Sequence, residues 1–260
     1  MKSTSLATLL AGSCLLAVTA SAAESAKPAD PRFFELRTYW SPEGKLPDLQ
    51  ARFRNHTLTI FKKHGIENIA YWTPVDNKEN KLVYLLAYPS KEAREKSWKE
   101  FFADPEWKEV AKKTEANGKI VAKVESTYLI PTDYSAVLKT GELSKGGVFE
   151  MRTYTANEGK LPNLDARFRD HTVKLFEKHG MMNYGYFHVA PGGKGSETTL
   201  LYFLSHKSQD AAKASFAAFG SDEAWKAARA ASEKNAGGSL TIQGGVKSEF
   251  LVPTDYSPTK

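Results

Sequence analysis

The chain has 260 residues, of which 41% are hydrophobic and 25% charged, and its formal net charge is +6. This length holds one large domain or two small ones, and the composition is typical of a globular protein rather than a disordered or fibrous one. The basic excess is small and no basic stretch is interleaved with aromatic residues, which argues against nucleic-acid binding.

The first 23 residues have the pattern of a cleaved signal peptide. Lys2 precedes an apolar stretch from Leu6 to Val18, and small residues follow at 20–23. The A-x-A pattern favours cleavage after Ala22, with cleavage after Ala23 as the alternative. We therefore expect an exported protein, secreted or periplasmic, whose residues 24–31 form a linker.

Two other interpretations of the leader fit less well. A lipid anchor at Cys14 conflicts with the apolar stretch that continues past it, and a mitochondrial presequence conflicts with the absence of arginine. Cleavage removes Lys2 and the single cysteine, so the net charge falls to +5 (6 − 1) and no disulfide remains. No later stretch is apolar enough for a transmembrane segment.

Residues 32–135 contain the elements of one module, taken here in chain order. Alternation predicts a strand at 33–39, and helical periodicity predicts a helix at 43–65, with Pro47 in its first turn and Gly65 just past its end. Strands follow at 66–72 and 82–88, the second apolar enough for burial on both faces. A helical region at 90–115, broken near Asp104, and a strand at 120–130 complete a β-α-β-β-α-β order. That order predicts a ferredoxin-like module.

A second copy of this module occupies residues 147–257, after a linker at 136–146. The segment FELRTY at 34–39 returns as FEMRTY at 149–154, an offset of 115. The offset is 118 between Trp107 and Trp225, and 122 between the PTDYS segments at 131–135 and 253–257. It grows only in glycine-rich loops, as expected of a duplicated folded unit. Each copy would expose an apolar sheet face, so we expect an α+β monomer in which the two sheets pair as a pseudo-dimeric α/β barrel.

The ordered set of motifs resembles the NIPSNAP family. It comprises the ELRTY strand, the GKLP helix start, a helical histidine before KHG, and DPEW, and the resemblance spans both modules. It implies the dimeric α/β-barrel fold of cofactor-free monooxygenases, EthD-like proteins and dye-decolourising relatives. The animal members are linked to vesicle traffic and mitochondrial quality control. The second copy departs from the pattern with DEAW at 222–225 and a glycine-rich last strand, which leaves open whether the two pockets are equivalent.

The first strand of each copy places charged side chains on one face. Alternation puts Phe34, Leu36 and Thr38 on one side and Glu35, Arg37 and Tyr39 on the other. We expect the apolar set to pack on the helices and the charged set to face the barrel interior, as would Glu150, Arg152 and Tyr154 in the second copy. Two interpretations remain open: a buried ion pair, or an arginine that binds an anion or carbonyl in a cavity.

His56 and His171 are the second candidates. Each falls within the apolar stripe of the first helix of its copy, at intervals of three and four residues. A half-buried imidazole there serves as a core residue with a polar partner or as a general base. His64 and His179 lie at helix ends, and His188 and His206 have no counterpart in the first copy.

Aromatic residues of the second strand of each copy are expected to be mostly core, with some lining an apolar ligand cavity. They are Tyr71, Trp72, Tyr186 and Phe187. No metal-ligand spacing or phosphate loop is present, so no metal or cofactor is expected. Haem ligation by His171 is a minor alternative.

The sequence thus favours a binding protein for a small apolar or aromatic molecule in an interior barrel cavity. The alternative is a cofactor-independent, monooxygenase-like enzyme, with His56 or His171 as base and Arg37 or Arg152 holding negative charge.

Overall fold

The computed structural model describes residues 29–143 and 147–260. The predicted signal peptide at 1–23, residues 24–28 of the first predicted linker and residues 144–146 of the second lie outside the described residues. Within the described part no helix is long and apolar enough to cross a membrane.

Both repeats have the same order of elements. The first contains β1 (Phe33–Trp40), α1 (Leu46–Arg52), η1 (Phe53–Thr57), α2 (Leu58–Lys63), β2 (Glu67–Pro74), β3 (Lys81–Tyr88), α3 (Lys91–Ala103), α4 (Pro105–Thr114) and β4 (Lys123–Pro131). The second contains β5 (Val148–Ala156), α5 (Leu161–Arg167), η2 (Phe168–Thr172), α6 (Val173–Lys178), β6 (Met182–Val189), β7 (Thr199–His206), α7 (Gln209–Ser221), α8 (Glu223–Asn235) and β8 (Thr241–Pro253). Each predicted first helix is therefore one continuous helix whose middle turn, η1 or η2, is π-helical.

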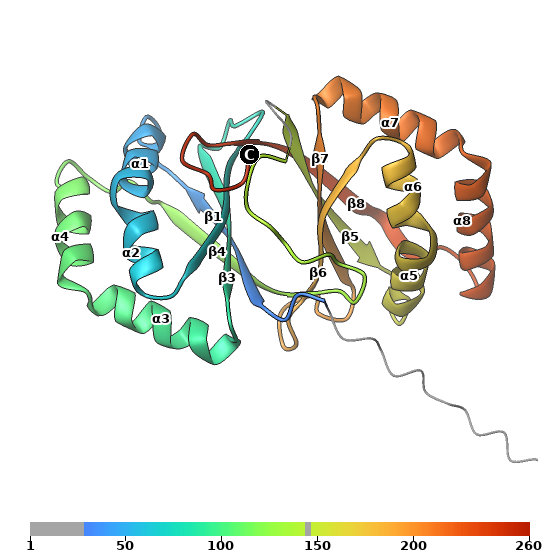
Figure 1. Ribbon diagram of the computed structural model, residues 1–260, viewed down its shortest axis with the longest axis horizontal. Coiled ribbons are helices and arrows are strands. Elements are labelled where there is room, and N and C mark those ends of the chain that lie inside the picture. The colour runs from blue at the N-terminus through green and yellow to red at the C-terminus, as the bar shows by residue number, and fades with distance from the viewer. Residues whose placement is uncertain (1–28, 144–146) are drawn as a thin grey trace, which may run out of the picture.

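The eight strands close into one barrel in the order β1-β3-β2-β8-β5-β7-β6-β4, and neighbouring strands are antiparallel. The repeats meet at two seams, β2–β8 and β4–β6, each with three paired residues. Figure 1 shows the strands in the middle and the helices of each repeat on opposite outer sides. The expected barrel of two paired sheets is confirmed.

Side chains from both repeats fill the barrel interior. Trp72 stacks on Phe203 across the barrel with ring centroids 5.2 Å apart, and Phe34 meets Phe187 edge-on at 5.1 Å. Leu85 is fully buried, and every other core member of this cluster is at most 7% exposed. The expectation of an interior ligand cavity is therefore wrong, because large aromatic side chains occupy that space.

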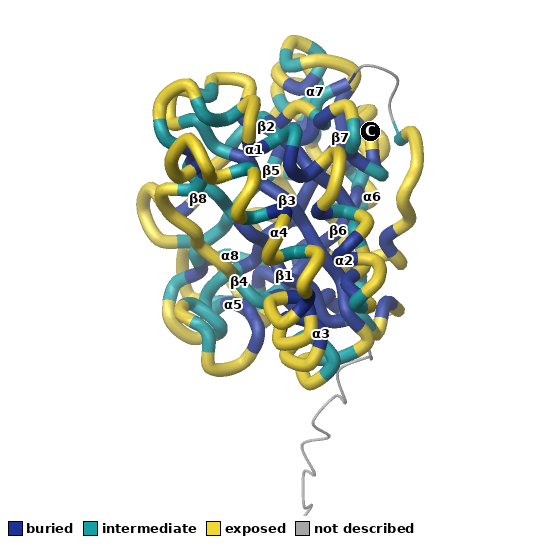
Figure 2. Tube along the Cα trace, turned by 90° about the vertical axis from the view of Figure 1, so that its left-hand side faces the viewer, coloured by how far each residue is buried: buried dark blue, intermediate teal, exposed yellow. Residues whose placement is uncertain are grey.

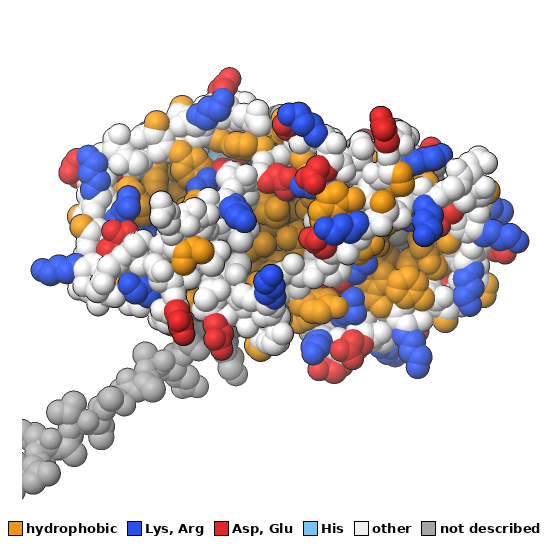
Figure 3. All heavy atoms as spheres, turned by 180° about the vertical axis from the view of Figure 1, so that it is seen from behind, with side chains coloured by type: hydrophobic (Ala, Val, Ile, Leu, Met, Phe, Trp, Pro, Cys, Tyr) orange, Lys and Arg blue, Asp and Glu red, His pale blue; other side chains and the backbone are white. Residues whose placement is uncertain are grey.

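Two further apolar layers lie between the sheet and the helices, one in each repeat. Strand β3 contributes to both the barrel interior and its own helix layer, which confirms its predicted burial on both faces. In Figure 2 the buried residues follow the central strands, and the exposed ones follow the outer helices and loops. Seen from behind, apolar side chains also gather in the middle of the molecule, between its two halves (Figure 3).

The predicted break in the second helical region lies at Asp104. Its carboxylate accepts a hydrogen bond from the Glu106 amide at 2.8 Å and so caps α4. It also contacts His64 Nε2 at 2.7 Å. Asp222 caps α8 and meets His179 in the same way, so the sequence DEAW preserves the cap despite its departure from DPEW.

Candidate functional site

The charged face of β1 points toward the helices rather than into the barrel. Phe34 and Leu36 belong to the barrel interior, whereas Glu35 and Arg37 contact Trp98 of α3. The orientation predicted for Glu35, Arg37 and Tyr39 is therefore wrong, and so is that for Glu150, Arg152 and Tyr154. Strand alternation separates two faces but does not say which one the helices cover.

In the first repeat, Glu35 lies at the centre of a buried polar cluster. It forms an ion pair with Arg37 and accepts hydrogen bonds from Arg94 at 2.9 Å, Tyr88 at 3.0 Å and Trp98 at 3.1 Å. Burial opposes ionisation of Glu35, but the hydrogen bonds and charges of Arg94 and Arg37 outweigh it and hold its pKa below the ordinary value. The ion-pair interpretation is therefore confirmed here.

The second repeat builds the same cluster from different residues. Glu150 pairs with Arg152 and Ser248, and its other oxygen lies 3.1 Å from His206 Nε2. Burial again opposes ionisation, but these partners hold the pKa of Glu150 below its ordinary value. Ala212 stands where the first repeat has Arg94.

The remaining members of the predicted charged faces complete these clusters. Arg37 donates to the Tyr84 hydroxyl at 2.9 Å and to Tyr39 at 3.2 Å. Arg152 makes the equivalent contact with Tyr154 at 3.3 Å. With their donors directed at neighbouring side chains, these arginines act as structural ion-pair residues.

His56 and His171 are exposed, so their predicted place in the apolar stripe is wrong. A π-helical turn contains one residue more than an α-helical turn, which shifts the buried position from His56 to Thr57 and from His171 to Thr172. Thr57 donates to the Arg52 carbonyl oxygen, five residues back, at 3.2 Å.

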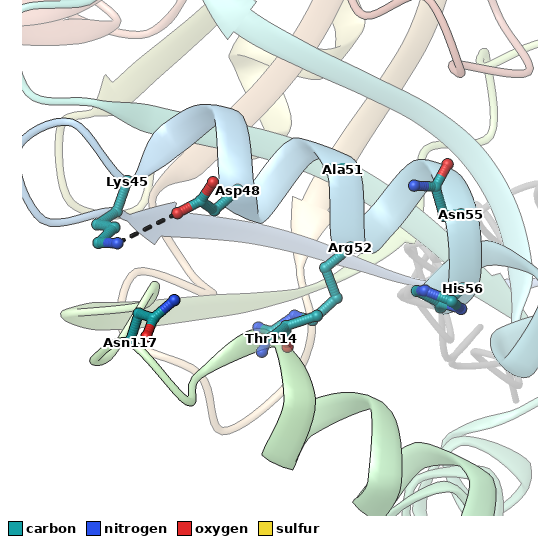
Figure 4. Close-up of a pocket in the computed structure, with 8 residues that line it drawn as sticks. All are labelled: Lys45, Asp48, Ala51, Arg52, Asn55, His56, Thr114 and Asn117. Atoms are coloured by element: carbon teal, nitrogen blue, oxygen red, sulfur yellow. Dashed lines mark hydrogen bonds and ion pairs between the residues drawn. The ribbon is translucent and has the colours of Figure 1, made fainter.

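Each displaced histidine lines a polar groove on the outer side of its repeat. Groove 1 has a volume of about 260 Å³ and is lined by Lys45, Asp48, Ala51, Arg52, Asn55, His56, Thr114 and Asn117. Groove 2 has about 170 Å³ and is lined by Asn163, Ala166, Arg167, Asp170, His171, Ala228, Ala231, Ser232 and Asn235. In Figure 4, Arg52 reaches across groove 1 from the first helix toward Thr114, and His56 lies near one end of the groove.

The four aromatic candidates are all fully buried core residues. Trp72 and Phe187 face the barrel interior, whereas Tyr71 and Tyr186 face the helices. The expectation that most of them are core is confirmed.

A pocket larger than either groove lies at the β4–β6 seam. It has a volume of about 670 Å³, and we call it the seam pocket. Its walls come from the start of β1, the start of α3, strand β4, the end of β6 and the loop after β6. They consist of Phe33, Lys91, Ser126, Thr127, Tyr128, Ile130, Val189, Ala190, Pro191, Gly192, Gly193 and Lys194. None of these residues was a predicted site residue.

Among the described residues, no group of three or more His, Cys, Asp or Glu side chains could hold a metal ion. Sequence reasoning also missed Arg94 and gave His206 little weight. Both lie more than fifty residues along the chain from the glutamate they contact. The only signal in the sequence concerns His206: the repeat alignment puts it at the position of Tyr88, which contacts the matching glutamate, Glu35.

The fold and these sites define a two-repeat α+β barrel protein. The NIPSNAP family model matches residues 34–136 and 149–258, one match for each repeat. The chain therefore belongs to the NIPSNAP family. No curated protein matches the sequence.

Solved structures share the fold at low sequence identity. A protein from Lactobacillus acidophilus, provisionally named a monooxygenase, superimposes with a TM-score of 0.55 over 86% of this chain and 94% of its own, at 10% identity. An anthrone oxidase-like protein has a TM-score of 0.53 over 89% and 95%, at 12% identity. A NIPSNAP family protein of unknown function from Agrobacterium tumefaciens covers 44% of this chain and 99% of its own, with 22% identity and a TM-score of 0.39.

Proposed function

We propose that this protein binds a small amphipathic organic acid in the seam pocket. The observation that carries the proposal is the pocket itself: its volume of about 670 Å³ lies within the range of small-molecule sites, and its walls combine apolar side chains with a serine, a threonine and two lysines. The expected small apolar or aromatic ligand is retained, but its place moves from the barrel interior to the outer seam.

The lining favours a ligand with an apolar body and one anionic group. Phe33 and Tyr128 lie with ring centroids 5.7 Å apart, and Ile130 adds an aliphatic surface. Lys91 and Lys194 supply positive charge, and no carboxylate is among the described residues that line the pocket. An aromatic carboxylate or sulfonate would match both features, because its ring covers apolar side chains while its charge meets an ammonium group.

The loop after β6 is longer than its counterpart in the first repeat and forms part of the pocket wall. It spans residues 190–198, whereas the corresponding loop after β2 spans residues 75–80, three residues fewer. Gly193 turns tightly against β6: a Cβ there would lie 2.7 Å from Val189 Cγ1 and 3.0 Å from the Ala190 carbonyl oxygen. The extra residues of the second copy thus form one side of the pocket.

The geometry gives less support to the alternative of a cofactor-independent enzyme. That mechanism needs His56 or His171 beside Arg37 or Arg152. Each histidine lines an outer groove, and neither arginine lines the groove of its repeat. Likeness to proteins named as oxidases or monooxygenases at such low identity concerns the fold alone.

We also propose that each repeat is a ferredoxin-like module, which the antiparallel order β4-β1-β3-β2 supports. Internal pairing of the modules favours a monomeric chain.

The leader pattern at 1–23 supports export of the protein to the periplasm or the cell exterior.

The binding proposal is tested with 1-anilinonaphthalene-8-sulfonate, a fluorescent aromatic sulfonate. We expect saturable 1:1 binding that Ile130→Glu weakens about tenfold or more, since a carboxylate on the apolar wall repels the anion. Val252→Glu is the matched control, because Val252 holds the position of Ile130 at the other seam and the charge change is the same.

A second arm tests the acid group. Lys91→Gln combined with Lys194→Gln should weaken sulfonate binding but not binding of the neutral N-phenyl-1-naphthylamine. Circular dichroism establishes that each variant is folded, since this sulfonate also binds partly unfolded protein. Equal affinity in Ile130→Glu and Val252→Glu would refute the seam pocket as the binding site.

A further inference from the structure

The two outer grooves are copies of one another. Arg52 and His56 in groove 1 match Arg167 and His171 in groove 2 at the offset of 115. On the opposite wall, Thr114 and Asn117 match Ser232 and Asn235 at the offset of 118. The duplication thus provides two versions of the same arrangement, in which a helix carrying Arg and His faces a helix end carrying a hydroxyl and an amide.

Each groove contains a buried arginine with unused donors. Arg52 is 5% exposed, and the only hydrogen bond of its side chain within the described residues joins Nη1 to Glu115 Oε1 at 2.9 Å. Arg167 is 6% exposed and its side chain makes no hydrogen bond within the described residues; Glu233 Oε1 lies 3.8 Å from Nη1. The Nε atom of both arginines is buried without a partner.

Such guanidinium groups are unusual in a protein interior. A guanidinium has five N–H donors, and burying them without acceptors is unfavourable. Each guanidinium instead contacts a tryptophan ring. The guanidinium carbon of Arg52 lies 5.2 Å from the Trp107 ring centroid, and that of Arg167 lies 5.2 Å from the Trp225 ring centroid. Burial lowers the pKa of Arg167 from its ordinary value, as expected where no close carboxylate compensates.

The rest of each groove adds donors around the arginine. In groove 1, Lys45 and the amides of Asn55 and Asn117 line the same space as Arg52, and Figure 4 shows them along both walls. Asp48 is the only carboxylate of this lining, and Lys45 already contacts it at 3.2 Å. Groove 2 keeps Arg167 and Asn235, has Asn163 as a donor in place of Asp48, and carries one carboxylate, Asp170, in place of Asn55.

We propose that each groove binds a compact oxyanion, either free or as the phosphoryl group of a small molecule, through the unused donors of Arg52 and Arg167. The anion accepts from in-plane N–H groups at the edge of the guanidinium, whose face lies over the tryptophan, and from the asparagine on the facing wall. Charge-assisted hydrogen bonds of this kind are the strong ones, and arginine suits the geometry of oxyanions. This site is separate from the seam pocket and does not depend on it.

The experiment follows the Nε–Hε signals of Arg52 and Arg167 by ¹H–¹⁵N NMR of the whole protein during titration with inorganic phosphate at constant ionic strength. We expect both signals to shift saturably. Asn117→Asp should weaken binding in groove 1 about tenfold while groove 2 is unchanged, and Asn235→Asp should do the reverse, because a carboxylate repels the anion. Both asparagines are exposed, so the fold should tolerate these changes.

The control is Lys108→Gln, which changes the net charge by the same amount at an exposed position of α4 outside the groove. It should leave both affinities unchanged. Glycerol 3-phosphate distinguishes the sources: tighter binding than phosphate supports a phosphorylated molecule, and equal binding supports a free anion. The proposal is overturned if neither Nε–Hε signal moves with either probe, or if Asn117→Asp and Asn235→Asp behave like Lys108→Gln.

Discussion

Glu35 and Glu150 occupy matching positions but are neutralised differently. Arg37 and Arg94 surround Glu35, whereas Glu150 has one arginine and His206. Because both carboxyl groups have pKa values below the ordinary one, their ionised forms stabilise the folded state. That stabilisation is complete above the pKa of an unfolded glutamate, about 4.3, and is lost as the pH falls through the folded value.

Glu35→Gln should therefore destabilise the protein in a pH-dependent way. At pH 7 we expect a loss of about 3 kcal/mol, because the change leaves two arginines beside an uncharged amide in a buried site. The difference from wild type should shrink as the pH falls below about 4.3, because the unfolded wild-type carboxyl is then protonated and the ionised folded one contributes less stability. Urea unfolding at pH 7, 5, 4 and 3.5 measures this, with the exposed Glu43→Gln as control. A difference that does not change with pH would contradict the argument.

For these residues, the sequence predicted only the contacts whose two partners lie on the same strand. The pairing of Glu35 with Arg37 follows from alternation, since positions two apart share a face. The contacts of Arg94 and His206 could not be predicted in this way, because they depend on how α3 lies against the sheet and on the register of β7 beside β5. The wrong face was assigned because the charged side was expected to avoid the helices, yet Trp98 and Tyr88 of the helix layer supply hydrogen-bond donors.

At the scale of elements, the first helix of each repeat explains the other failure. Its extent was predicted within a few residues, but a constant period of 3.6 residues placed His56 inside. The π-helical turn adds one residue, so the buried face passes from Phe53 to Thr57 and then to Ile60. Nothing in the local sequence requires this turn. The offset of 115 predicts only that the second repeat behaves alike, and it does.

Thr57 should hold the π-helical turn in place. Its hydroxyl donates to the Arg52 carbonyl oxygen in a fully buried position. Thr57→Val keeps the shape but leaves that carbonyl without this donor, and we expect a loss of about 1–2 kcal/mol in the free energy of unfolding. Thr59→Val, on the exposed side of α2, is the control for changing a helical threonine to valine. Equal losses in urea unfolding of the two variants would show that the Thr57 hydrogen bond contributes nothing.

At the scale of the whole molecule, the interior packing does more than the seams to join the two repeats. Each seam has only three paired residues, whereas the interior cluster takes large side chains from both repeats. The tandem arrangement of the sequence was enough to predict the barrel. The sequence did not predict which aromatic residues fill the barrel, because Trp72 and Tyr71 are neighbours on one strand and face opposite layers.

Trp72 is the residue that tests this coupling most directly. It is fully buried, stacks on Phe203 and lies 5.4 Å from the Phe149 ring centroid, both in the second repeat. Trp72→Ala should lower the free energy of unfolding by about 3–5 kcal/mol through the cavity it leaves. Because that cavity opens against β5 and β7, hydrogen exchange under mild urea should show reduced amide protection in the second repeat as well as the first.

Phe61→Ala provides the comparison within one repeat. Phe61 is equally buried, but its ring contacts are with Phe53, Trp98 and Phe101 of its own helix layer. Its loss should reduce amide protection mainly in the first repeat, at a similar overall cost of about 3–5 kcal/mol. If the loss of protection in Trp72→Ala also stops at the first repeat, the interior cluster does not couple the repeats, and the two seams alone must hold the barrel closed.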